Sequence, residues 1–345
     1  MDRLERLERL ERLEQLEERL TDLLVIQPTP FCNLDCDYCY LPNRDSRARI
    51  SSRVLRRAFE QVLGSRYVGE RLSVVWHAGE PTVLPISFYE EAFALLREVN
   101  TAHLPVRHCF QTNATLIDGG WCSLFARQRV RVGVSVDGPA FLHDARRKSR
   151  DGRGTHARVM AGIRCLKEHE TPFYVISVLT DRALDHPDEL FAFYLESGLS
   201  RVCFNIEEIE GVNTSSSLTM AGVETKLRAF MARLLELRRE TGFALDVREI
   251  DGFRRFVEGS DGFVESAQEN TPMRIVSVDC HGNYSTFSPE LLGVKSERWG
   301  DFLLGNVLRD DLDAVESSPR FQRLRDEIDA GVAACRESCP YFGVC

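Results

Sequence analysis

Short apolar, β-rich runs alternate with amphipathic segments from residue 24 to about residue 241, and this alternation limits the possible folds more than any other feature. Six such runs, each followed by a segment with helical periodicity, predict a parallel sheet with right-handed helical crossovers. Because the closed barrel of this type has eight units, six units predict a partial barrel. The predicted strands lie in LLVIQPT, LSVVWHAG, RHCFQTN, VRVGVSVDG, FYVISVLT and RVCFNIEE.

Polar residues gather where the predicted strands end, in the stretches HAGEP, QTN, SVDGP and NIEE. The carboxyl ends of parallel strands meet at one edge of the sheet, and α/β barrels carry their chemistry at that edge. We therefore expect the functional site there.

Three cysteines follow the first predicted strand in the stretch CNLDCDYC. A closed structural zinc site takes four ligands, and the next cysteine along the chain is Cys109. Three thiolates instead suit a 4Fe-4S cluster in which one iron stays open for an exchangeable ligand. Cys32, Cys36 and Cys39 are therefore the predicted ligands, and an open iron indicates chemistry at the cluster.

The C-x3-C-x-aromatic-C pattern, with Tyr38 as the aromatic residue, resembles the cysteine loop of the radical S-adenosylmethionine (SAM) superfamily. The resemblance implies an α/β fold with a partial (β/α)6 TIM-like barrel over residues 22–241, and a catalytic 4Fe-4S cluster and SAM as cofactors. It also implies that an external one-electron reductant drives cleavage of SAM to methionine and a 5'-deoxyadenosyl radical, which abstracts hydrogen from a substrate carbon. The protein would then position that radical and exclude competing reactions.

Further stretches resemble the SAM-binding segments of the family in the same order. HAGEP matches the segment that holds the methionine amine, with alanine in place of the usual first glycine. SVLT matches the segment near the adenine, and Arg147 is the implied cation for the SAM carboxylate. The implied cofactor-binding residues are Tyr38, Ala78, Gly79, Glu80, Gln111, Asn113, Ser135, Asp137, Arg147, Val178, Leu179 and Thr180.

A second group of cysteines lies near the carboxyl end, in CRESCPYFGVC, with Cys280 upstream in a glycine-rich turn. Residues 242–345 resemble a SPASM-type domain, the module of peptide-maturing radical SAM enzymes that binds auxiliary iron-sulfur clusters. A full domain of that type has further cysteines, so we expect a shortened version with one auxiliary 4Fe-4S cluster. Its implied ligands are Cys280, Cys335, Cys339 and Cys345, and a zinc knuckle of the same four is the alternative.

The stretches VIQPTPFCNLDCDYCYLPNR, VVWHAGEP and GNYSTFSPELLG resemble the cyclophane-forming, GrrM-like maturases of glycine-rich-repeat peptides. The resemblance implies a ribosomally made precursor peptide as substrate and a bond between an aromatic ring and a side-chain carbon. Glu207 and Glu208, at the end of the sixth predicted strand, are catalytic candidates that would bind a peptide amine or accept a proton. A sulfatase-maturing oxidase, a peptide epimerase and a thioether-forming enzyme remain alternatives. A non-catalytic iron-sulfur or zinc interaction protein is the alternative from another class.

The rest of the sequence sets expectations for partners and location. Residues 1–21 repeat Arg-Leu-Glu and predict a charged helix, which is either a solvated extension or a self-association helix. The net charge of -9 argues against nucleic acid, and no apolar run approaches the ~20 residues of a membrane span. The amino end lacks a signal-peptide pattern, so we expect cytoplasmic residence. There we expect no disulfides and four core cysteines, Cys109, Cys122, Cys165 and Cys203.

Overall fold

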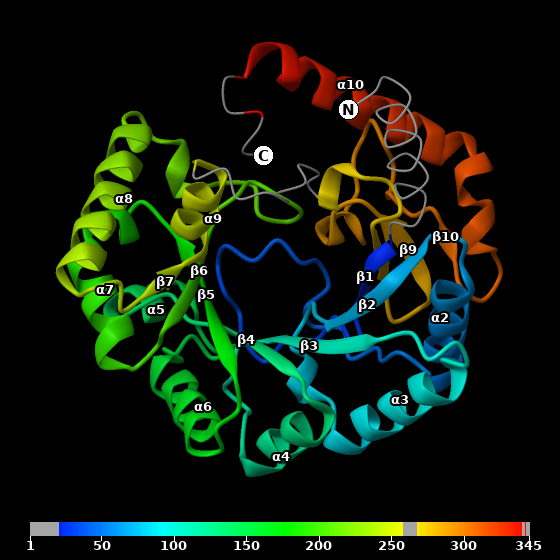
Figure 1. The fold of residues 1–345 in the computed structure, drawn as a ribbon, viewed down its shortest axis with the longest axis horizontal. Coiled ribbons are helices and arrows are strands. Elements are labelled where there is room, and N and C mark those ends of the chain that lie inside the picture. Colours follow the sequence, from blue (N-terminus) through cyan, green and yellow to red (C-terminus); the bar gives the residue numbers. More distant parts are fainter. Residues whose placement is uncertain (1–20, 258–267, 340–341, 343–345) are drawn as a thin grey trace, which may run out of the picture.

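One sheet of ten strands curves around the centre of the molecule, with helices on its outer face (Figure 1). The computed structural model describes residues 21–257, 268–339 and 342; the predicted helix over residues 1–21 lies outside this part except for Thr21. The strands are β1 (Thr21–Ile26), β2 (Val68–Trp76), β3 (Val106–Thr112), β4 (Arg131–Ser135), β5 (Phe173–Leu179), β6 (Arg201–Ile206), β7 (Asp246–Val247), β8 (Ile275–Val278), β9 (Asn283–Thr286) and β10 (Gly305–Asn306). The helices are α2 (Ser52–Gly64), α3 (Ile86–Val99), α4 (Gly119–Gln128), α5 (Ala140–Arg146), α6 (His156–Glu168), α7 (Pro187–Glu196), α8 (Val223–Glu240), α9 (Arg248–Val257) and α10 (Pro319–Ser338).

The strand order is β10-β9-β8-β1-β2-β3-β4-β5-β6-β7, so the sheet has two edges and does not close. Strands β1 to β7 pair in parallel with their sequence neighbours, as right-handed crossovers require. All six predicted strands and the helical segments after them are confirmed. The partial barrel is therefore the architecture of this chain.

The helices form where their apolar residues make one face. In α2 the Ser51 hydroxyl caps the first turn by accepting from Val54 N, at 3.2 Å. One face of the helix then buries Val54, Leu55, Ala58, Phe59 and Val62 against the sheet. This amphipathic pattern is what keeps the helices on the outside of the curved sheet.

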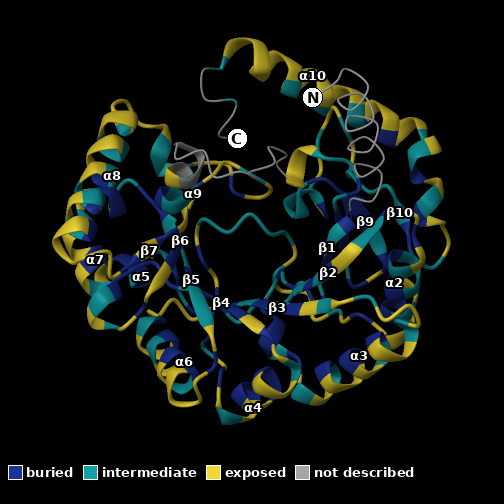
Figure 2. Cartoon of the chain, in the orientation of Figure 1, coloured by how far each residue is buried: buried dark blue, intermediate teal, exposed yellow. Residues whose placement is uncertain are grey.

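Burial alternates from residue to residue along β3 and β5, as Figure 2 shows by colour. In β3, Phe110 is buried and packs on Phe125 of α4, with ring centroids 5.2 Å apart. Its neighbours Cys109 and Gln111 project to the opposite face and stay partly exposed. The concave face of the sheet is therefore reached by solvent, whereas the convex face is a packed core.

The carboxyl half of the chain returns to the start of the barrel. Strand β8 pairs in parallel with β1, and β9 and β10 continue the sheet in antiparallel fashion. The Thr21 hydroxyl donates to Met273 O, at 2.5 Å, which ties the start of β1 to the segment before β8. The strand pattern read from the sequence stops near residue 241 and misses these strands and β7, because two to four residues show no period. The domain boundary predicted between residues 241 and 242 stays a prediction. Strands on both sides of it belong to one sheet.

No helix in the described part of the chain is both long enough and apolar enough to span a membrane.

Candidate functional site

The three predicted cluster cysteines lie on the loop after β1, which crosses the concave side of the sheet (Figure 1). Cys36 is buried, and Cys32 and Cys39 are partly exposed. The loop is fastened at the start and in the middle of the cysteine motif: Cys32 N donates to Arg44 O at 3.2 Å, and Asp35 N donates to Lys148 O at 2.7 Å. The loop is thus a fixed platform at the carboxyl ends of the strands, as predicted.

Three arginines that the sequence analysis did not single out bind this loop. Arg44 donates to Cys36 O at 3.2 Å, and Arg150 donates to Cys32 O at 2.7 Å. Arg146 pairs with Asp37 inside the motif, with 2.9 Å between Nε and Oδ1. These guanidinium groups hold the backbone of the motif and place positive charge around the thiols, which suits an anionic cluster–thiolate assembly.

The thiols fit a cluster better than a single ion. In the described part of the chain, the only group of three ligand atoms within 4.8 Å of one another lies elsewhere, so these cysteines are not gathered around one ion. Burial raises the pKa of Cys32 to about 12, with a further contribution from Glu80. Burial also raises the pKa of Cys36 to about 11, although Arg147 opposes it. Both thiols therefore hold their protons until a cationic metal group replaces them.

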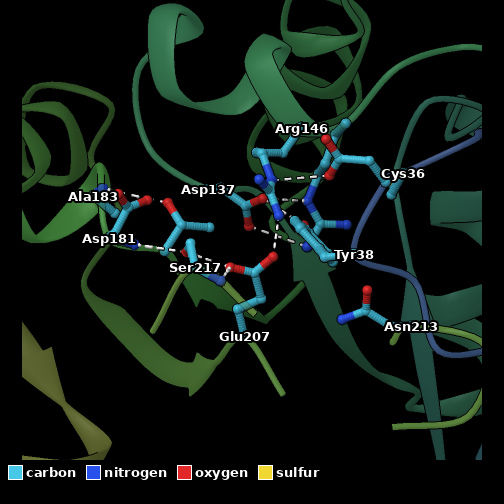
Figure 3. Close-up of polar contacts among 12 residues, drawn as sticks. Cys36, Tyr38, Asp137, Arg146, Asp181, Ala183, Glu207, Asn213 and Ser217 are labelled. Atoms are coloured by element: carbon cyan, nitrogen blue, oxygen red, sulfur yellow. Dashed lines mark hydrogen bonds and ion pairs between the residues drawn. The ribbon is translucent and has the colours of Figure 1, made fainter. Parts of the chain in front are cut away.

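Asp137, at the end of β4, joins three segments around the loop (Figure 3). It accepts hydrogen bonds from the Tyr38 hydroxyl at 2.5 Å and from Val178 N at 3.0 Å. Arg147 makes a two-point pair with it, through Nε at 2.8 Å and Nη2 at 3.1 Å. Arg147 is thus buried and donates two hydrogen bonds to Asp137. Its contact with the SAM carboxylate stays a prediction from the resemblance.

Glu80 is a second buried carboxylate with protein donors around it. It accepts from Thr82 N and the Thr82 hydroxyl, from the Thr112 hydroxyl at 2.7 Å and from Asn113 N at 2.7 Å. Burial raises its pKa, and these donors counteract the rise. In this geometry Glu80 ties the end of β3 to the loop after β2, and its predicted contact with an ammonium group stays a prediction.

Two consecutive left-handed residues precede Glu80. Ala78 has φ 65° and Gly79 has φ 59°. A Cβ on Gly79 would lie 2.5 Å from Phe31 O and from Thr29 O, so only glycine allows the two loops to approach this closely. The alanine at the first position accepts a conformation that costs a non-glycine residue about 1–2 kcal/mol.

Some of the remaining predicted SAM-binding residues face the concave side of the sheet, and the others are buried. Gln111 and Ser135 lie on the concave face, and the Gln111 amide donates to the Ser135 hydroxyl at 2.9 Å. Asn113 is buried beside the motif, with its amide donating to Asn33 and 3.9 Å from Cys32 Sγ. Leu179 and Thr180 are buried on β5 and just after it, so of the SVLT stretch only Val178 presents a partly exposed side chain.

The Glu207 carboxylate is held by neighbouring side chains, whereas the carboxylates of Glu208 and Glu210 are more accessible. Its carboxylate pairs with Arg146 and accepts from the backbone and hydroxyl of Ser217, so it joins β6 to the cysteine loop (Figure 3). Glu208 is exposed. Burial, with repulsion from Glu290, Glu208 and Glu269, raises the pKa of Glu210 to about 7. Glu207 is therefore positioned to brace the loop. The predicted catalytic roles of Glu207 and Glu208 stay predictions, and the structure adds Glu210 as a candidate for proton transfer.

The predicted auxiliary ligands lie in two parts of the structure, and Cys345 lies outside the described residues. Cys280 is buried in the turn between β8 and β9, next to the carboxyl end of β1. Cys335 is exposed in the last turn of α10, and Cys339 N donates to Cys335 O at 2.8 Å. A shared metal site for these cysteines stays a prediction.

Comparisons with known proteins support this interpretation. A family model described as the Radical SAM superfamily matches residues 26–194. An uncharacterised protein of Synechocystis sp., sll1766, is 42% identical over 329 residues, which cover 94% of this chain and 82% of that protein. The serine-type anaerobic sulfatase-maturating enzyme of Bacteroides thetaiotaomicron is 32% identical over 171 residues, covering 48% of this chain and 41% of that enzyme. The chain thus matches less than half the length of that sulfatase-maturating relative.

Two solved structures share the fold over most of the chain. The structure of anSMEcpe with bound AdoMet and the Cp18Cys peptide has a TM-score of 0.77 at 22% identity, covering 94% of this chain and 87% of that one. Streptococcus suis SuiB bound to its precursor peptide SuiA has a TM-score of 0.63 at 18% identity, covering 91% of this chain and 69% of that one. They agree with the partial barrel deduced from the sequence.

Proposed function

Because residues 26–194 match the radical SAM superfamily model, we propose that this chain is a member of that superfamily and modifies a peptide bound at the open, concave side of its sheet. As a radical SAM enzyme it uses a 4Fe-4S cluster and SAM, which together supply the carbon radical that removes hydrogen from the substrate. Cys32, Cys36 and Cys39 would hold the cluster, and an external one-electron reductant would drive it. This chain's own task is to hold the peptide and aim one of its carbons at that radical.

A single structural observation favours a peptide over a small molecule. The sheet has free edges at β7 and β10, and its concave face carries the partly exposed side chains of Cys109 and Gln111 on β3. An open-sided barrel admits an extended chain from the side, which a closed barrel would exclude. The two structures of similar fold hold peptides, Cp18Cys and SuiA, which supports the same substrate class here.

The product that we propose is a cyclophane, a carbon–carbon link between an aromatic ring and a neighbouring side chain. One hydrogen leaves the side-chain carbon as an atom, and the ring hydrogen leaves as a proton and an electron when the new bond forms. The electron needs an acceptor, and an auxiliary cluster on the carboxyl-terminal cysteines would serve. The proton needs a base, and Glu210 suits that role because an acceptor with a pKa of about 7 works at neutral pH.

Sulfatase maturation is the second candidate, and the 32% identity to the Bacteroides enzyme favours it. Oxidation of a serine side chain to an aldehyde also removes two hydrogens, so the change in mass alone does not separate the two products. An aldehyde reacts with a hydrazide, whereas a cyclophane does not. A cyclophane instead suppresses backbone fragmentation between the two joined residues.

The experiment uses the anaerobically reconstituted full chain with SAM, dithionite and two synthetic peptides. One peptide carries aromatic residues between glycines, taken from a short reading frame beside the gene, and the other carries a sulfatase-type serine and cysteine. We expect the first peptide to lose two hydrogens and to resist fragmentation within one aromatic-containing segment. A hydrazide-reactive product from the second peptide alone would favour sulfatase maturation instead.

Two other outcomes would contradict the proposal. An unchanged mass with one inverted stereocentre would indicate an epimerase, and turnover of a small non-peptide molecule alone would remove the peptide assignment. The control is the triple variant Cys32→Ala, Cys36→Ala, Cys39→Ala, which should lose about four irons and all deoxyadenosine formation. SAM cleavage retained in that variant would contradict the cluster assignment.

A further inference from the structure

Two cysteines and a histidine meet between α4 and α6, on the outer layer of helices. Cys122 Sγ lies 3.7 Å from Cys165 Sγ, and Cys165 Sγ lies 3.7 Å from His169 Nδ1. One ligand atom from each residue falls within 4.8 Å of the other two. Within the residues that the structure describes, no other set of three His, Cys, Asp or Glu side chains comes so close together.

These distances match the edges of a tetrahedral metal site. With zinc bonded to sulfur at about 2.3 Å and to nitrogen at about 2.0–2.1 Å, neighbouring ligand atoms in a tetrahedron are roughly 3.6–3.8 Å apart. The two measured contacts have this length before any ion is bound. A thiol pair with an adjacent imidazole is also the ligand set that zinc prefers over magnesium or calcium.

We propose that Cys122, Cys165 and His169 bind one Zn²⁺ ion on the outside of the barrel, apart from the cysteines assigned to iron. From the sequence, Cys122 and Cys165 are expected to be plain core residues, because they stand scattered in apolar stretches; they are 43 positions apart. The fold alone brings them together, and His169 completes the set from the end of α6. The proposal does not depend on the reaction that the enzyme performs.

The surroundings suit a dication. Two thiolates balance the charge of the ion, so the occupied site is neutral where Cys122 is buried. His169 is exposed, which leaves a path for the metal from solvent. Its Nδ1 donates a hydrogen bond to Cys165 O at 2.9 Å, so ligation through Nδ1 would replace that bond and leave the imidazole proton on Nε2.

Water would complete the fourth position of the proposed site. Asp118, the nearest acid along α4, already caps that helix by accepting from Gly120 N at 2.9 Å and Trp121 N at 3.1 Å. The ion would tie the first turn of α4 to the end of α6, two helices that are joined here by side-chain packing. Because the ion binds only the folded chain, it raises the unfolding temperature with increasing zinc.

The test measures zinc in the full-length protein with its iron-sulfur clusters in place. After equilibration with Zn²⁺ and a competing chelator, we expect about one zinc per chain by mass spectrometry. The zinc absorption edge should report two sulfur neighbours at about 2.3 Å and one nitrogen at about 2.0–2.1 Å. Iron does not interfere, because that spectrum is specific to the element.

The variants separate this site from the others. His169→Gln and Cys165→Ser should each lower the zinc content from about one per chain to near zero and remove the zinc-dependent rise in unfolding temperature. His103→Gln is the matched control, since His103 is also exposed and also follows the end of an outer helix. It should leave both readouts unchanged. His169→Gln changes an exposed residue, so its folding can be verified by its zinc-free unfolding temperature.

Three results would overturn the proposal. Zinc retained in both His169→Gln and Cys165→Ser but lost in Cys339→Ser would assign the metal to the carboxyl-terminal cysteines. A Cys122–Cys165 disulfide without bound zinc would make the pair a redox element. If the wild-type chain loses all its zinc to the chelator, Cys122, Cys165 and His169 are ordinary packing residues.

Discussion

Replacing Asp137 with asparagine removes the charge at the centre of the network beside the cysteine loop and leaves the shape of the side chain almost unchanged. Asp137 and Arg147 are both nearly fully buried, with side-chain exposures of 6% and 9%. They face each other through two hydrogen bonds of 2.8 and 3.1 Å. The variant leaves the Arg147 guanidinium buried without an anionic partner.

The expected cost follows from that burial. Removing one partner of a buried ion pair typically costs about 3–5 kcal/mol, because the other charge stays desolvated. For a chain of this length, with an unfolding entropy of roughly 2.1 cal/mol/K per residue, such a loss lowers the unfolding temperature by about 4–7 °C. Arg147→Met combined with Asp137→Asn should recover part of the loss, since no buried charge is then left unpaired.

The pH dependence of this effect has a definite sign. Burial by itself would raise the pKa of Asp137, but Arg147, His143 and the Tyr38 hydroxyl together outweigh it, and the pKa is lowered from 3.8. A carboxyl whose folded pKa is depressed stabilises the fold at all pH values above its unfolded pKa and loses that effect as pH falls through the folded pKa. The difference between wild type and Asp137→Asn should therefore be constant between pH 6 and 8.

The assay is thermal unfolding under anaerobic conditions, with variants compared at equal iron content. Asp151→Asn is the control, because Asp151 is paired with Arg153 at the surface, where solvent screens the interaction. It should change the unfolding temperature little. An Asp137→Asn effect no larger than the control, or strictly additive effects of Asp137→Asn and Arg147→Met, would refute the argument from the buried pair.

Three further predictions address other parts of the chain. Cys339→Ala should lower iron by about four per chain while SAM cleavage persists, and a wild-type content of only about four irons would contradict an auxiliary cluster. Ala78→Gly should stabilise the chain by about 1 kcal/mol or less, because glycine accepts φ 65° without strain; a loss in chemical denaturation would show that the methyl group packs favourably. Since the folded pKa of Glu210 is raised from 4.5 to about 7, its contribution to stability is greatest below pH 4.5 and is lost as pH rises through 7. Glu210→Gln should therefore flatten the fall in unfolding temperature over that range, and an unchanged slope would contradict the raised pKa.

Local sequence was enough to predict the barrel and to place the three candidate iron ligands on one loop. The β/α alternation is a periodic signal within each segment, and it predicted all six strands that follow one another in the sheet. The spacing of Cys32, Cys36 and Cys39 fits within one loop, so no distant contact was needed to recognise it. The stretches HAGEP and SVDGP were located correctly at strand ends for the same reason.

Tertiary structure decided what those polar residues can do. In the sequence, Glu80 and Asp137 are simply polar residues at strand ends. In the structure, both carboxylates accept hydrogen bonds from other strands and loops, and sequence spacing does not reveal these partners. Strand β8 pairs with β1 across some 250 residues, and its four residues are too few to show a period. The meeting of Cys122 with Cys165 has the same origin, because which helix faces pack together depends on how the whole sheet curves.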